Sequence, residues 1–94
     1  MVLLDLLGRR WTLRILWELR DGPLTARALR AACDEASPSV LQARLSDLRD
    51  GGLVDHTAGS GYGLTAQGTE LLTAFQPLYG FAERWAGARP TTRG

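Results

Sequence analysis

Residues 37–54 read SPSVLQARLSDLRDGGLV, and the rest of the chain is organised around them. Ser37 before Pro38 is a helix-start signal, because the hydroxyl can accept hydrogen bonds from free backbone N–H groups and proline suits the first helical position. Leucines then recur at the spacing i, i+4, i+7 and form one narrow apolar stripe: Leu41, Leu45 and Leu48. The glycine pair at 51–52 ends the pattern. The stretch therefore predicts an amphipathic helix over Ser37–Asp50.

The face opposite the leucines is slim and polar. Its side chains are short and mostly uncharged: Ser39, Gln42, Ala43, Ser46 and Asp47. A helix with such a face can enter the major groove of DNA, with its first turns nearest the base edges. An ordinary amphipathic helix with a solvated outer face has the same pattern, so the neighbouring segments must decide between the two interpretations.

Helical patterns precede this stretch. Val2–Leu7 is a short apolar patch, and residues 11–19, WTLRILWEL, are apolar on two sides. One side holds Trp11, Ile15 and Leu19, and another holds Leu13 and Trp17. Thr25 then caps a second short helix over Ala26–Cys33. Two short helices joined by a tight turn, the second of them slim and polar outside, predict a helix-turn-helix.

A hairpin pattern follows the stretch. Leu53–Thr57 is suited to a strand, residues 58–61 (AGSG) to a glycine-rich turn, and Tyr62–Thr65 to the returning strand. A β-hairpin directly after a helix-turn-helix is a wing. The predicted fold is therefore mainly α with a small β-hairpin (α+β), a winged helix-turn-helix, and this order of elements favours the DNA interpretation.

The last segment predicts a long helix over Ala66–Ala86, capped by Thr65. Apolar side chains follow at 4, 3, 4, 3 spacing and form a helix-pairing seam: Leu71, Phe75, Leu78, Ala82 and Trp85. Pro77 removes a helical N–H, so we expect a kink or break near Gln76. Residues 1–87 are predicted to form a single winged-helix domain with terminal dimerisation helices, and residues 88–94 a disordered tail.

Composition bounds the remaining possibilities. The 94 residues make one domain of modest core, and the net charge of +1 excludes a strongly basic nucleic-acid binder. The single cysteine excludes an intramolecular disulfide framework and predicts a cytoplasmic setting, and no apolar run reaches the length of a membrane span. The one histidine and the absence of a phosphate-binding lysine loop predict no enzyme, no metal site and no cofactor.

Three motifs in this order resemble the HxlR family of bacterial winged-helix transcriptional regulators, relatives of the MarR group. They are GRRWTLRILWELRDGP at 8–23, SPSVLQARLSDLRDGGLV at 37–54 and YGLTAQG at 62–68. The resemblance implies a homodimer whose recognition helices enter successive major grooves, with wings touching the flanking minor groove or backbone. The chain departs from the family pattern in its short, neutral wing and in lacking an N-terminal Cys-Pro segment.

The predicted DNA-binding residues lie on the helix, before it and on the wing. They are Arg10, Ser37, Ser39, Val40, Gln42, Ala43, Arg44 and His56. Arg10 matches a basic position of the family before the first long helix, and the resemblance implies that it contacts a phosphate. Gln42 has the amide needed to read adenine. Two interpretations stay open for Arg44: a contact to phosphate or a base edge, or an intramolecular pair with a nearby acid such as Asp47.

Self-association is predicted from apolar surface that one small domain cannot cover. The predicted dimer interface comprises Leu3, Leu6, Leu13, Trp17, Leu71, Phe75, Leu78, Tyr79 and Trp85. The aromatic side chains of the first and last long helices, including Phe81, have an alternative role, which is to line a cavity for a small aromatic or lipophilic effector. Cys33 is interpreted as a core-filling residue, with a thiol sensor as the alternative.

The sequence thus predicts a homodimeric regulator that binds a pseudo-palindromic operator in double-stranded DNA. The rival hypothesis is a winged-helix module for protein interaction or small-molecule sensing with weak DNA affinity. The low net charge and the short neutral wing favour that rival.

Overall fold

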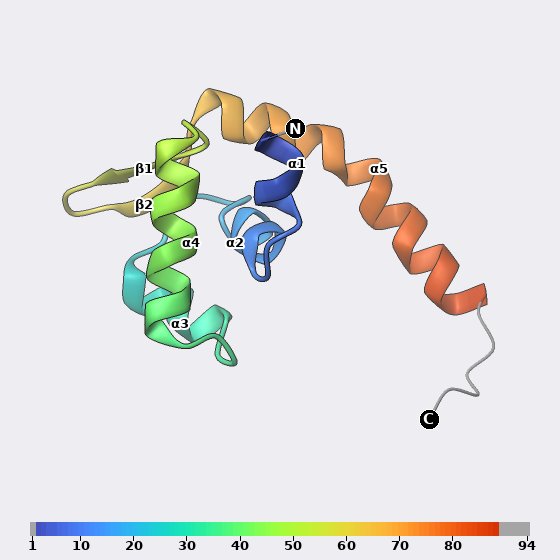
Figure 1. Cartoon of the computed structure of the whole chain (residues 1–94), viewed down its shortest axis with the longest axis horizontal. Helices are drawn as coiled ribbons and strands as arrows, with labels where there is room; N and C mark the ends of the chain where they lie inside the picture. The colour runs from blue at the N-terminus through green and yellow to red at the C-terminus, as the bar shows by residue number, and fades with distance from the viewer. Residues whose placement is uncertain (1, 89–94) are drawn as a thin grey trace.

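The computed structural model describes residues 2–88, as five helices and one two-stranded antiparallel sheet (Figure 1). In chain order they are α1 (Val2–Leu7), α2 (Thr12–Glu18), α3 (Ala26–Ala32), α4 (Pro38–Asp50), β1 (Val54–Thr57), β2 (Gly61–Leu64) and α5 (Ala66–Ala88). The order is that of a winged helix-turn-helix, with α3 and α4 as the two helices of the motif and the hairpin as the wing. The predicted fold class is confirmed.

One apolar core joins α2, α3, α4 and the wing. Its members are buried: Ile15, Leu16, Leu19, Leu29, Cys33, Ala36, Leu41, Leu45, Leu48, Leu53, Val54 and Tyr62. The leucine stripe of α4 faces inward as its spacing predicts, and all three leucines are at most 1% exposed. The body of the domain is therefore closed around one face of α4.

Each predicted helix cap forms. Thr25 Oγ1 accepts a hydrogen bond from the Ala28 N–H at 3.1 Å, and Ser37 Oγ accepts from the Val40 N–H at 3.2 Å. Thr65 Oγ1 accepts from the Gly68 N–H at 3.0 Å and also donates to the Gly52 carbonyl at 2.6 Å. These caps satisfy N–H groups that have no partner inside the helix, so they fix where α3, α4 and α5 begin.

The wing is a short antiparallel ladder in which Val54 pairs with Leu64 and Thr57 with Gly61. Leu24 extends the ladder, because its N–H and carbonyl both bond to Tyr62, at 2.8 and 2.7 Å. Gly61 has a φ of 94°, and a Cβ there would overlap the Leu24 carbonyl. Only glycine allows this close approach, which ties the wing to the segment before α3.

Helix α2 is shorter than predicted at both ends. Trp11 is not helical but precedes the helix with a φ of 76°, a left-handed conformation that is uncommon outside glycine. The helix ends at Glu18, and α3 ends at Ala32, one residue before the predicted end. Periodicity alone did not reveal these ends, because the turn residues that close the helices continue the same apolar spacing.

Helix α5 is continuous through Pro77, so the break that was one of the two expectations near Gln76 does not occur. The other expectation, a kink, is consistent with the bend of the helix along its length (Figure 1). A proline removes a single N–H donor, and the hydrogen bonds of the adjoining turns carry the helix past it. Ala88 is the last helical residue, one beyond the predicted domain boundary. The remainder of the predicted tail, 89–94, lies outside the described residues.

The second half of α5 extends away from the body (Figure 1). Only Gly68 and Leu72 of this helix are buried. The described chain is accordingly elongated, with principal extents of 46 × 26 × 26 Å.

Candidate nucleic-acid interface

Helix α4 presents its outward face from a rigidly held position. The leucine stripe anchors it to the core, Ser37 and Pro38 define its start, and Gly52, with a φ of 76°, follows its end. Four of the five residues predicted for the outward face are exposed, namely Ser39, Gln42, Ala43 and Ser46, whereas Asp47 is partly buried and pairs with Arg44. Val40, which was not predicted on this face, is exposed as well. In its first turns the face carries no charged group, and most of its side chains are short, which suits a helix that enters a major groove.

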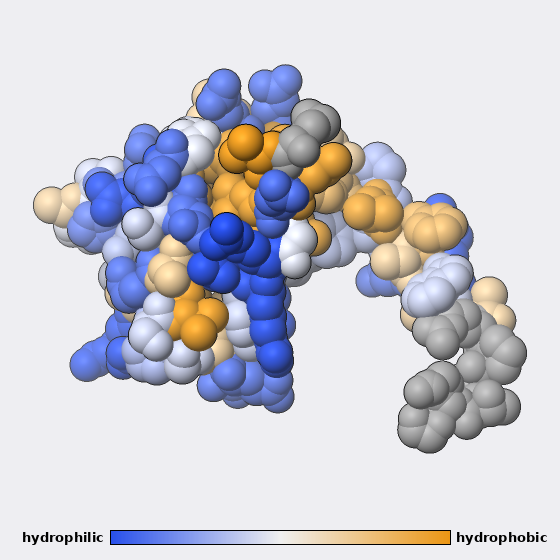
Figure 2. Space-filling model, in the orientation of Figure 1, coloured by the Kyte–Doolittle hydropathy of each residue, from blue (hydrophilic) through white to orange (hydrophobic). Residues whose placement is uncertain are grey.

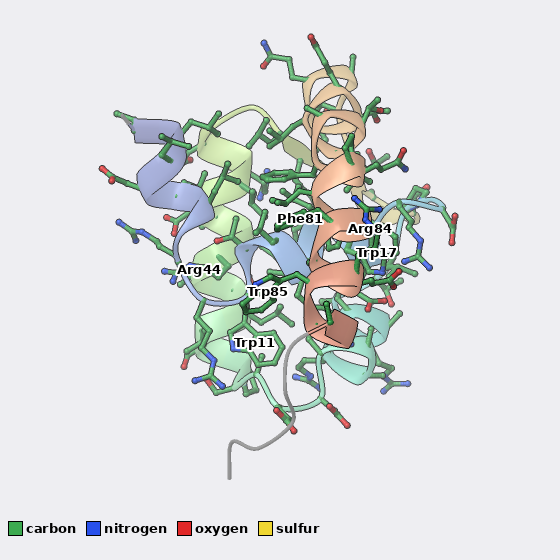
Figure 3. All side chains as sticks on the ribbon, turned by 90° about the vertical axis from the view of Figure 1, so that its right-hand side faces the viewer. Trp11, Trp17, Arg44, Phe81, Arg84 and Trp85 are labelled. Carbon is green, nitrogen blue, oxygen red and sulfur yellow. The ribbon has the colours of Figure 1, made fainter. Side chains whose placement is uncertain are left out.

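Arg44 is engaged within the chain. Its Nε donates to Asp47 Oδ2 at 3.1 Å, and its side chain is only 18% exposed. The same carboxylate oxygen of Asp47 is also approached by Arg9, at 3.5 Å. Figure 3 shows Arg44 on the side of α4 that faces the α1–α2 connection. Of the two interpretations left open by the sequence, the structure favours the intramolecular pair.

Arg9 is a residue that sequence reasoning missed. It lies in the connection between α1 and α2, and its contact with Asp47 ties that connection to α4. The signal was present in the pair Arg9-Arg10, but nothing in the sequence showed that the connection would lie beside α4. Arg10 is exposed, and its guanidinium carbon lies 5.5 Å from the centroid of the Trp11 ring. Its charge therefore remains available at the surface.

The wing lies beside α4 and is neutral at its tip (Figure 1). His56 is exposed on β1, and its ring lies 4.6 Å from that of Tyr62 on the paired strand. Tyr62 is buried, so the contact holds the imidazole against the hairpin. Predicted DNA-binding residues thus occur on α4 and on two parts that lie beside it, the α1–α2 connection and the wing.

The predicted dimer residues differ in how far their own chain covers them. Leu6, Leu13 and Leu71 are half-buried and pack against the core of their own chain. Trp17 and Tyr79 contact each other, with ring centroids 4.6 Å apart, and the Tyr79 hydroxyl donates to the Leu13 carbonyl at 3.3 Å. These side chains attach the middle of α5 to α2. Burial raises the pKa of the Tyr79 hydroxyl, so it remains a donor at neutral pH.

Three other predicted dimer residues, Leu3, Leu78 and Trp85, belong to an exposed apolar surface on α1 and α5, which we call the α1–α5 face. Its members are Val2, Leu3, Leu4, Leu78, Phe81 and Trp85, the last three each about half exposed. Figure 2 shows apolar side chains gathered over α1 and the first part of α5 and continuing along α5. In Figure 3, Phe81 and Trp85 project from one side of α5, and Arg84 from the other. Val2, Leu4 and Phe81 were not singled out in the prediction, but they lie in the Val2–Leu7 and Leu71–Trp85 segments from which the dimer was expected to be built.

A shallow apolar groove of about 180 Å³ adjoins the α1–α5 face. It is lined by Leu13, Phe75, Leu78, Tyr79 and Ala82. Cys33 lies elsewhere, in the core, where burial raises the pKa of its thiol. A buried, protonated thiol is a poor nucleophile, which favours the core-filling interpretation.

Within residues 2–88 there is no cluster of three or more His, Cys, Asp or Glu side chains that could hold a metal ion. None of the described helices is long and apolar enough to cross a membrane.

Comparisons with known proteins agree with this geometry. Quinone-bound YodB from B. subtilis is 31% identical, with a TM-score of 0.79 over 85% of this chain and 90% of that chain. A possible HxlR family transcriptional factor from Thermoplasma volcanium GSS1 is 29% identical, with a TM-score of 0.81 over 88% of this chain and 80% of that chain.

The activation domain of the phage T4 transcription factor MotA shares the fold alone, at 20% identity and a TM-score of 0.66 over 86% of this chain and 85% of that chain. No curated protein sequence matches the chain significantly. The model of the HxlR-like helix-turn-helix family, in contrast, matches residues 6–90. The chain therefore belongs to the HxlR-like helix-turn-helix family, whose structural neighbours here are transcriptional regulators.

Proposed function

We propose that the protein binds a pseudo-palindromic operator as a homodimer and regulates transcription by occupying it. The observation that carries the proposal is the outward face of α4, which is slim, exposed and uncharged over its first turns while its leucine stripe is fully buried. A helix so held can enter a major groove without rearranging the body. The exposed charges of Arg10, and of Arg27 and Arg30 on α3, are available for phosphates.

The dimer is proposed from the α1–α5 face. Val2 is 86% exposed, and Leu78, Phe81 and Trp85 are each more than half exposed. These side chains continue one apolar surface from α1 along the part of α5 that leaves the body (Figure 2). In a two-fold symmetric dimer, the α1–α5 faces of the two chains cover each other. The same symmetry places the two α4 helices so that they can enter neighbouring major grooves.

A gel-shift series on genomic DNA fragments tests the proposal. Gln42→Ala is expected to weaken specific binding by roughly 1–3 kcal/mol, since it removes a side chain that reaches a base edge. Arg10→Ala is expected to weaken binding to all DNA sequences alike and to make the affinity less dependent on salt, as the removal of a phosphate-binding side chain does. Parent protein that binds no fragment above background, while folded and dimeric, contradicts the proposal and favours the rival protein-interaction module.

A second candidate function is the sensing of a small aromatic or lipophilic effector. The groove of Leu13, Phe75, Leu78, Tyr79 and Ala82 favours it, because the lining is apolar and adjoins the proposed dimer interface. One structural neighbour, YodB, is quinone-bound. Binding of the probe 1-naphthol is measured by the change that it causes in the tryptophan fluorescence of the protein. Ala82→Phe, which fills the groove, is expected to abolish the response, whereas Gln76→Phe, an exposed residue outside the lining, is expected to keep it. Equal responses from both variants contradict the assignment.

A further inference from the structure

We infer that α4 reads A·T base pairs, with Val40 and Ala43 against thymine methyl groups and Gln42 against adenine. The inference rests on the proposed function, because it requires that α4 enter the major groove. It goes further by naming the base pairs that the helix accepts and the side chains that select them.

The first step is the absence of an available guanine reader in the first half of α4. Arginine, bidentate to the O6 and N7 atoms of guanine, makes the commonest specific contact in the major groove. Arg44 is the only cation between Pro38 and Ser46, and its Nε is held by Asp47 at 3.1 Å. With 18% of its side chain exposed, it lies on the flank that faces the α1–α2 connection (Figure 3).

Arg49 is exposed but lies in the last turn of α4. The first turns of a recognition helix are the ones nearest the base edges, so Arg49 is placed for the phosphate backbone. The reading positions therefore hold no charged donor that could select guanine.

The second step is what those positions do expose. Val40 is 37% exposed and Ala43 is exposed, and their i, i+3 spacing makes them neighbours on the helix surface. Figure 2 shows a small apolar patch over the N-terminal half of α4, within a mostly polar surface. In the major groove the thymine C5-methyl is the apolar group that a base pair presents. An apolar pair at the reading positions is thus matched to thymine.

The third step concerns Gln42, which is exposed on the other side of Ala43 from Val40. Its side-chain amide forms no hydrogen bond among those found in residues 2–88. An amide can donate to adenine N7 and accept from adenine N6 at once. Val40, Ala43 and Gln42 together therefore favour A·T pairs, with methyl groups on one side of the helix and an adenine edge on the other.

Arg44 has a positioning role in this scheme. The carboxylate of Asp47 would repel DNA if it stood alone, and Arg44 and Arg9 both neutralise it. Arg44→Ala is expected to weaken binding to every duplex alike, whereas a residue that reads bases changes the preference between duplexes.

The experiment begins with selection from a library of random duplexes by the full chain. In the selected site, each thymine is then replaced by uracil, which lacks only the methyl group. We expect this replacement to weaken binding at one or two positions in each half-site, by about fourfold for each methyl group that packs against α4. Val40→Ala is expected to remove that sensitivity at one position, and Asp50→Asn, an exposed position at the far end of the same helix, to leave it unchanged.

The outcomes separate this inference from the function on which it rests. Failure to enrich any duplex contradicts the proposed function itself. Enrichment of a site whose half-sites carry invariant guanines, or that tolerates uracil at every thymine, contradicts only the A·T assignment. Because Val40 is a surface residue, its variant remains folded, and circular dichroism verifies this before binding is measured.

Discussion

Helices α4 and α5 are both amphipathic, yet the chain covers the apolar side of only one of them. The stripe of α4 is closed by the domain, and its leucines are at most 1% exposed. Of the 23 residues of α5 only Gly68 and Leu72 are buried, and Phe81 and Trp85 remain more than half exposed. The position of α4 is therefore determined within one chain. The second half of α5 keeps its apolar side chains exposed.

The two helices also differ in how they are attached. Helix α5 is fixed at its start, where Thr65 caps it and where a Cβ on Gly68 would overlap the Leu53 carbonyl. Its middle is attached to α2 by the contact between Trp17 and Tyr79. Its second half extends from the body (Figure 1), and no residue of that half is buried. The following predictions test this contrast.

The largest effect is expected in the α4 stripe. Leu45→Ala is expected to destabilise the fold by about 2–5 kcal/mol, because it leaves a cavity that the close-packed core can fill only in part. Urea unfolding at constant protein concentration measures it. Ser46→Ala, on the exposed side of the same turn, is expected to change stability by less than about 0.5 kcal/mol. Equal losses from both substitutions would show that α4 is not packed as described.

The next effect concerns assembly. Leu78→Glu is expected to weaken the dimer by about 1–3 kcal/mol, because the carboxylate would be buried without a partner at the proposed interface. Gln76→Glu adds the same charge to an exposed position of the same helix outside the groove lining and is the matched control. Sedimentation equilibrium measures both. A parent chain that sediments as a folded monomer at micromolar concentration would remove the dimer and, with it, the palindromic-operator model.

A smaller difference is expected between the two helix caps. Ser37→Ala is expected to cost about 1 kcal/mol, the typical loss of one N-cap. Thr65→Ala is expected to cost more, since Thr65 also donates to the Gly52 carbonyl and that acceptor would lose its partner. Thermal unfolding of the two variants side by side provides the comparison. If Thr65→Ala instead costs less stability than Ser37→Ala, the hydrogen bonds of the Thr65 hydroxyl do not hold the start of α5.

The smallest effect involves Cys33. Burial, the main cause, raises the pKa of its thiol, so the folded state keeps the proton to a higher pH than the unfolded state. The stability that this contributes is full below the pKa of the unfolded thiol, roughly pH 8.5, and is lost as the pH rises through the folded pKa. Cys33→Ala is therefore expected to flatten the fall in stability above that pH, as urea unfolding across a pH series measures.

Peroxide provides a second readout for the same residue. DNA binding by the parent is expected to be insensitive to mild oxidant, as in Cys33→Ser. A response in the parent that the variant abolishes would instead support the sensor hypothesis for Cys33.

Much of the candidate site could be predicted from local patterns. The caps at Ser37 and Thr65 formed as their hydroxyls indicated, and the leucine spacing assigned the outward face of α4 before any contact was known. Such features depend on residues within one or two turns of each other, so the sequence states them directly. The glycine-rich hairpin was predicted for the same reason.

Other features depended on which elements meet in space. The engagement of Arg44 follows from Asp47 one turn away and is reinforced by Arg9, whose approach required the α1–α2 connection to lie against α4. The left-handed Trp11 and the continuity of α5 through Pro77 were likewise decided by the assembled structure. The sequence by itself determined the elements and their faces, because periodicity and capping act over a few residues. The tertiary structure decided the partners of the charges and the apolar surface left over, because these depend on distances between segments remote in the chain.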